Sequence, residues 1–157
     1  MNRLLELEVK LNKVIDEQEG KVLERDETLD WERIHMASSA RCAWLLAMQR
    51  GVEPELAACA AAVHDYGRIL TGKQKNHAEE GYEPVKAFLT ETGIFNEEEI
   101  EIIALAVKNH SLKTETGSPI EEIVKDADVI DCYQYGCPFD RPEKEVRYNK
   151  WRKENGI

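Results

Sequence analysis

The sequence contains no apolar run that approaches the roughly 20 residues needed by a membrane-spanning helix. Its first residues, MNRLLELEVKLNK, lack the continuous apolar segment of a secretory signal peptide. Basic residues are also few, since 21 lysines and arginines face 31 aspartates and glutamates and give a net charge of -10. This balance disfavours nucleic acid and anionic membranes as general partners, although a local basic pocket could still hold phosphate. We therefore expect a cytoplasmic protein that binds neither.

None of the four cysteines belongs to a CxxC pair. Cys42 and Cys59 stand in apolar stretches with helical spacing, where a free cysteine commonly packs as a small hydrophobic residue. Cys132 and Cys137 could respond to redox conditions, but their spacing gives little support for a zinc site. The cysteine pattern therefore agrees with a cytoplasmic location.

The sequence has no β-strand signal, internal repeat, linker or low-complexity tract, and its apolar residues recur at spacings of three and four. Capping-box patterns mark helix starts at 96–99 and 118–121. Residues 69–76 are expected to form a polar loop, and Pro84 to kink or restart its helix. We predict helices at about 3–19, 29–50, 53–63, 76–92, 96–109, 118–133 and 142–153.

These segments predict a compact all-α fold of about six or seven helices in one domain, residues 1–157. The core is expected at about 31–133, with helices 3–19 and 142–153 packed on it. In the last helix, Tyr148 and Trp151 are the residues expected to dock. The apolar faces of the two outer helices are explained equally well by a homodimer, so the oligomeric state stays open.

The stretch AACAAAVHDYGR, residues 57–68, places His64 and Asp65 at the end of a helix that is apolar on every side. Burying a carboxylate is costly unless it is paired or bound to metal, so both residues are candidate metal ligands. The alternative is an aspartate that caps or orients a neighbour. Further along the chain, Asp128 and Asp131 share the core face of the helix expected at 118–133, whereas Asp126 is expected to be solvated.

The ordered set of His35, His64-Asp65 and Asp128, together with His77 and His110, resembles the HD-domain superfamily of metal-dependent phosphohydrolases over roughly residues 31–133. The resemblance implies a helical HD-domain fold that brings His35, His64, Asp65 and Asp128 to one metal ion. Mixed imidazole and carboxylate ligands suit Fe, Mn, Co, Ni or Zn, and the sequence does not choose among them.

Two stretches resemble the binuclear members of that superfamily. HDYGRI at 64–69 is similar to their HDIGKI stretch, and HAEEGY at 77–82 is similar to the HxxxGY stretch of the HD-GYP branch. By that likeness Asp65 would bridge two ions, and His77 and His110 would bind the second ion. The chain thus resembles a short single-domain member that is closer to the binuclear type and holds one or two ions.

Two departures narrow the expected substrate. The stretch after Asn109 has a single histidine, His110, and no Gly-Tyr-Pro segment, which argues against cleavage of cyclic di-GMP. Arg68 stands where the mononuclear 5′-nucleotidase branch usually carries glutamate, which argues against that activity. Short binuclear members that act on nucleotides or dinucleoside polyphosphates remain compatible.

We therefore expect a phosphohydrolase that cleaves a phosphoester or phosphoanhydride, with a nucleotide as the expected small-molecule substrate, by means of a metal-activated water. Asp65 is the central catalytic candidate. Arg68, whose planar fork matches phosphate oxygens, is the first candidate for binding substrate, followed by Lys73 and Lys113 in nearby loops. Asp131 is expected to orient a ligand histidine. No residue is identified as the general acid.

Three other functions stay open at this point. A regulatory module could keep the fold and bind a nucleotide or metal without turnover. A di-iron oxygenase could use a similar ligand set for a different reaction. A plain helical adaptor with chance histidines would bind no stoichiometric metal.

Overall fold

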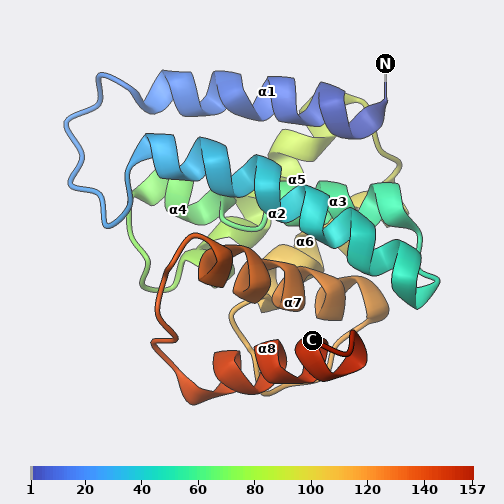
Figure 1. The fold of residues 1–157 in the computed structure, drawn as a ribbon. Coiled ribbons are helices and arrows are strands. Elements are labelled where there is room, and N and C mark those ends of the chain that lie inside the picture. Colours follow the sequence, from blue (N-terminus) through green and yellow to red (C-terminus); the bar gives the residue numbers. More distant parts are fainter. Residues whose placement is uncertain (1) are drawn as a thin grey trace.

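A computed structural model of the chain describes residues 2–157, which form helices and connecting loops with no strand (Figure 1). The all-α fold class is thereby confirmed. No helix in this part of the chain combines the length and apolarity needed to cross a membrane. The helices are α1 (Arg3–Gln18), α2 (Leu29–Arg50), α3 (Pro54–Ala62), α4 (Tyr66–Thr71), α5 (His77–Thr92), α6 (Glu97–Asn109), α7 (Pro119–Gln134) and α8 (Pro142–Glu154).

Local sequence signals account for most helix ends. Asn96 and Ser118 each form the reciprocal capping box that their sequences predict, with Glu99 and Glu121 as the returning side chains. Gly51 closes α2 in a left-handed conformation that a side chain would disfavour. These caps fix where α6 and α7 begin, and therefore which of their residues face the interior.

The expected polar loop at 69–76 is shorter than predicted, because α4 continues to Thr71. Ile69 is buried and holds this short helix on the core, and Gly72 ends it with a positive φ of 73°. Helix α5 continues through Pro84 as one helix and does not restart there. Its buried side chains on either side of the proline hold both halves against the core.

Helix α3 lies at the centre of the fold and contacts α1, α2, α6 and α7. Its residues from Leu56 to Ala62 are all buried, as its apolar composition predicts. Helix α1 covers one side with Leu4, Leu7, Leu11 and Ile15 fully buried. Figure 1 shows α1 and α8 at opposite edges of the molecule, with the other helices between them.

Helix α8 has no fully buried residue, and a partly buried ion-pair cluster links it to α7. Arg147 donates to the carboxylates of Glu122 at 3.0 Å and Asp126 at 2.8 Å, and to the carbonyl oxygen of Lys113 at 2.7 Å. The expectation that Asp126 is solvated was wrong, because Arg147 and Arg50 both pair with it and leave it only 5% exposed. Tyr148 and Trp151 pack partly buried against the core, as predicted.

Replacing Arg147 with methionine is expected to lower the free energy of unfolding by about 2 kcal/mol, since buried carboxylates lose a partner that solvent replaces only in part. Urea unfolding followed by circular dichroism measures this change. Arg152→Met, in the exposed last turn of the same helix, is the control and should unfold like the wild type.

The same variant should also change the response to acid. Partial burial alone would raise the pKa of Glu122, but the Gly117 amide, Arg147 and Lys125 lower it from 4.5 to about 2. Because the folded-state pKa lies below the unfolded value, this stabilisation is complete above about pH 4.5 and is lost as the pH falls toward 2. Arg147→Met should therefore lose less stability than the wild type across that window. Parallel acid profiles for the two proteins would contradict this assignment.

Candidate metal centre and its cleft

Six candidate ligands converge from five segments of the chain. His35 comes from α2, His64 and Asp65 from the turn between α3 and α4, and the others from the start of α5 (His77), the end of α6 (His110) and the middle of α7 (Asp128). The first five are at most 5% exposed, and the Asp128 side chain is 14% exposed. Helices that lie far apart in sequence thus deliver their polar side chains to one buried place.

The first group of donor atoms is formed by His35, His64, Asp65 and Asp128. The two Nε2 atoms of His35 and His64 are 3.1 Å apart. Asp65 Oδ2 lies 3.4 Å from the first of these nitrogens and 3.1 Å from the second. Asp128 Oδ1 lies 3.3 Å and 3.7 Å from the same two atoms. Each carboxylate therefore places one oxygen beside both imidazole nitrogens.

The second group shares Asp65 through its other oxygen. Asp65 Oδ1 lies 3.0 Å from His77 Nε2 and 3.5 Å from His110 Nε2, and these two nitrogens are 2.9 Å apart. The carboxylate of Asp65 therefore faces one group with each oxygen. This is the arrangement in which a single carboxylate can bridge two ions.

The donor spacings fit metal ions. Bonds of about 2.0–2.2 Å from an ion to nitrogen or oxygen place neighbouring ligands about 3.0 Å apart at right angles and about 3.4 Å apart in a tetrahedron. The observed separations run from 2.9 to 3.7 Å. Both groups could therefore close on an ion with only small side-chain shifts.

The hydrogen bonds of the four imidazoles point to the same conclusion. Each Nδ1 atom lies 2.6–2.7 Å from an oxygen that can only accept a hydrogen bond: Ala61 O for His64, Gln74 O for His77, Val107 O for His110 and Asp131 Oδ2 for His35. Each Nδ1 therefore carries a proton, so in a neutral ring the lone pair lies at Nε2. The Nε2 atoms of His35 and His64 face each other, as do those of His77 and His110, so each pair requires a proton or a metal ion between its two nitrogens.

The electrostatics of the centre favour a cation. Burial alone would raise the pKa of the Asp65 carboxyl, but Arg68 and His64 hold it well below its usual value. Burial alone would also raise the pKa of the Asp128 carboxyl, but Lys113 holds it well below its usual value. Burial alone would lower the pKa of His64, but Asp65 and Asp128 raise it to about 10. Two ionised carboxylates thus attract positive charge to His64 Nε2, as a proton or as a metal ion.

Arg68 does not offer its guanidinium to a substrate in this arrangement. It is buried and donates to both oxygens of Glu32 at 2.7 and 3.1 Å, to Gln74 at 2.7 Å and to Asp65 Oδ2. Four of its five N–H groups are thereby used by the protein. Arg68, which was predicted to bind phosphate, instead forms an ion pair with the Asp65 carboxylate.

The two lysines expected to bind substrate do not line the cleft over the ligand groups, whereas Arg68 does. Lys113 is buried, with its Nζ atom 2.6 Å from Asp128 Oδ2, so its charge is neutralised within the protein. Lys73 lies near Glu24 at 3.1 Å and Asp26 at 3.7 Å on the surface. Loop position alone suggested both residues, because sequence does not show which carboxylates lie beside a loop.

A cleft of about 350 Å³ opens over the two ligand groups. Its lining includes Asp65, His77, His110 and Asp128, the aromatic residues Trp31, Tyr133 and Phe139, and the basic residues Arg141 and Lys144. Sequence reasoning did not connect the last four with the site, because they lie at the end of α7 or after it, where the sequence predicted a helix end, a helix break and a charged outer helix. The chain after α7 therefore forms one wall of the cleft.

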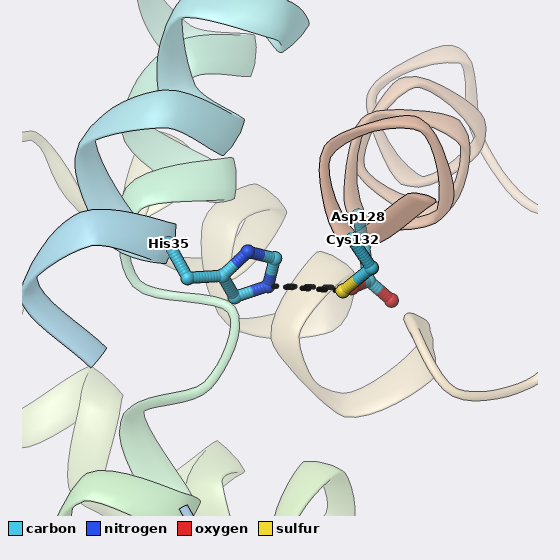
Figure 2. A group of neighbouring side chains, drawn as sticks. All are labelled: His35, Asp128 and Cys132. Carbon is cyan, nitrogen blue, oxygen red and sulfur yellow. Dashed lines mark hydrogen bonds and ion pairs between the residues drawn. The ribbon is translucent and has the colours of Figure 1, made fainter. Parts of the chain in front are cut away.

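Cys132 is a further donor that sequence reasoning did not connect with the centre. It follows Asp128 by one turn of α7 and faces His35 across the site (Figure 2). Its Sγ atom lies 4.0 Å from His35 Nε2 and 3.5 Å from Asp128 Oδ1. Burial and the charge of Asp128 raise the pKa of this thiol. The first ligand group thus has a sulfur atom at its cleft side, which would suit a borderline ion such as Zn or Fe.

Comparison with known families gives one match. The model described as HD domain matches residues 33–135, about two thirds of the chain, and this region contains all six candidate ligands. Comparison with curated proteins and with solved structures gives no match. Helices α1 and α8 lie outside the matched region.

Proposed function

The chain belongs to the HD-domain family, and we propose that it is a metal-dependent phosphohydrolase that cleaves a phosphoester or phosphoanhydride bond of a nucleotide. The observation that carries this proposal is the Asp65 carboxylate, whose two oxygens face two separate groups of imidazole nitrogens. A binding module or an adaptor would have no need for two such groups at the floor of an open cleft.

The residues divide into those that would hold ions and those that position them. His35, His64, Asp65 and Asp128 would hold a first ion, and the second oxygen of Asp65, with the other two histidines, would hold a second ion. Such ions supply a nucleophile at neutral pH and neutralise charge on phosphoryl oxygens. Asp131 accepts from His35 Nδ1 at 2.7 Å and so fixes the ring with its Nε2 toward the centre.

The aromatic lining of the cleft supports a nucleotide substrate. Trp31, Tyr133 and Phe139 border the same cleft as the candidate ligands. Trp31 itself stacks on the ring of His35, with the ring centres 5.0 Å apart. Stacking of a base on a protein ring contributes about 1–3 kcal/mol per base and tolerates different bases. A base at this wall would leave the phosphate over the ligand groups.

Metal content and phosphate release, measured on the same preparation, test the proposal. We expect about two ions per chain by elemental analysis and release from members of a nucleotide panel. Chelation should remove both properties, and adding metal back should restore both. One retained ion with full release would remove His77 and His110 from the ligand set.

The alternatives give different results in the same experiment. Bound metal without release from any phosphate compound would favour a nucleotide- or metal-binding module, or oxygenase chemistry. Absence of bound metal under every loading condition would contradict the central proposal and leave a helical adaptor.

A further inference from the structure

The wall of the cleft that lies outside the family match carries its own charged side chains. The match ends at residue 135, whereas Arg141 and Lys144 follow it at the start of α8. Both residues line the cleft over the ligand groups, and both also line an adjoining hollow of about 390 Å³. His77 and Asp140 border both spaces as well, and Lys108 lines the second. A molecule bound over the ligands can therefore extend past this basic wall.

Arg141 is held close to the second ligand group. Its Nη1 atom donates to the carbonyl oxygen of Ser111 at 3.2 Å, and Ser111 directly follows His110. The Ser111 hydroxyl lies 3.5 Å from His110 Nε2. The backbone that positions His110 thus also positions the guanidinium.

The guanidinium retains donors for a ligand. Among residues 2–157, Arg141 makes one side-chain hydrogen bond and one ion pair, with Glu143 at 3.4 Å, and Asp140 directly precedes it in the chain. Its side chain is 40% exposed. Lys144, one turn further on, has Asp140 at 2.7 Å and is 20% exposed. Arg68 and Lys113, in contrast, are buried and engaged by the protein.

This difference separates two kinds of positive charge in the site. Ions at the ligand groups would neutralise the phosphate that reacts, and Arg68 and Lys113 neutralise the carboxylate ligands. Arg141 and Lys144 neutralise neither the reacting phosphate nor a ligand carboxylate. They nevertheless line the cleft beside the ligand groups, in a chain with a net charge of -10. Arginine is suited to phosphate because its planar fork matches two oxygens.

We propose that Arg141 and Lys144 form a subsite for a second phosphate group of the substrate, which makes the substrate a phosphoanhydride and not a phosphomonoester. This inference rests on the proposed function, because it assumes that the ligand groups hold the phosphate that reacts. It assigns selectivity to the segment after α7, which the family match does not cover.

Binding of inorganic pyrophosphate and inorganic phosphate to the metal-loaded protein, followed by calorimetry, tests the subsite without turnover of a nucleotide. Arg141→Met is expected to weaken pyrophosphate binding about tenfold and to change phosphate binding less than about twofold. Arg141→Lys should recover part of the loss. Arg152→Met, which removes the same charge from the exposed end of α8, should match the wild type.

The possible outcomes separate the two proposals. If Arg141→Met binds pyrophosphate as tightly as the wild type, the subsite is overturned while the proposed function stands. Equal losses for phosphate and pyrophosphate would also overturn it, since Arg141 would then contact the reacting phosphate. If the metal-loaded wild type binds neither probe, the proposed function fails and the subsite fails with it.

Discussion

Asp65→Asn is expected to remove both metal ions and to lower phosphate release by at least about a thousandfold. The amide has one carbonyl oxygen and no negative charge, so it cannot supply a charged oxygen to each ligand group. Elemental analysis and phosphate release on the same preparation measure the two effects. The variant should still fold, because Arg68 keeps its two hydrogen bonds to Glu32.

Asp126→Asn is the matched control for this substitution. Asp126 is also a buried aspartate in contact with arginine, but its partners are Arg50 and Arg147, at the junction of α2, α7 and α8. The control should therefore lose stability and keep its metal. If Asp65→Asn lost a single ion, Asp65 would belong to one group only. Retention of two ions with normal release would rule out the central role of Asp65.

Local chemistry singled out His64 and Asp65 as candidate ligands, and the resemblance to the HD-domain superfamily supplied the full set. His64 and Asp65 stand out since a polar pair ends a helix that is apolar on every side. The capping boxes at Asn96 and Ser118 fix helix starts within a few residues. These signals depend on neighbours along the chain, so the helices and the polar residues that they carry were predictable without tertiary contacts.

The partners of the charged residues were not predictable in the same way. Arg68 and Lys113 were expected to reach substrate, and the structure pairs them with Glu32 and Asp128, which lie 36 and 15 residues away. An ion pair across such distances depends on how helices pack. Composition shows that a cation is present, but only the fold decides whether a carboxylate or a ligand neutralises it.

The same limit applied to Arg141 and Lys144. Their helix has a polar sequence with no fully buried residue, which is typical of a solvated outer helix. The structure turns its first residues toward the cleft, because Arg147 ties the helix to α7 and Arg141 bonds to the loop after α6. The position of a whole helix, and not a motif within it, gives these residues their place.

The close contact between α4 and α5 predicts a second large effect, in which a single added methyl group destabilises the protein. A Cβ atom added at Gly67 would overlap the carbonyl oxygen of His77 and lie 2.9 Å from the Gly81 nitrogen. Both are main-chain atoms, so α5 itself would have to move. Gly67→Ala is therefore expected to lower the free energy of unfolding by about 3 kcal/mol or more. Because His77 is the first residue of α5, the variant should also lose the second ion.

Gly81→Ala is the comparison variant with a smaller expected effect, because it adds a methyl group on the α5 side of the same contact. Its Cβ atom would lie 3.0 Å from the Gly67 nitrogen and 3.2 Å from a methyl group of Val107, which is a tight contact and not an overlap. Alanine also favours the helix interior over glycine by about 1 kcal/mol, which offsets part of the crowding. Gly81→Ala should therefore stay close to the wild type in urea unfolding and keep both ions.

Equal losses in the two variants would show that the contact between Gly67 and His77 does not set the position of α5. If instead only Gly67→Ala loses stability and one ion, the glycine of HDYGR belongs to the metal centre as much as the histidines do, because its missing side chain lets this stretch meet HAEEGY beside Asp65.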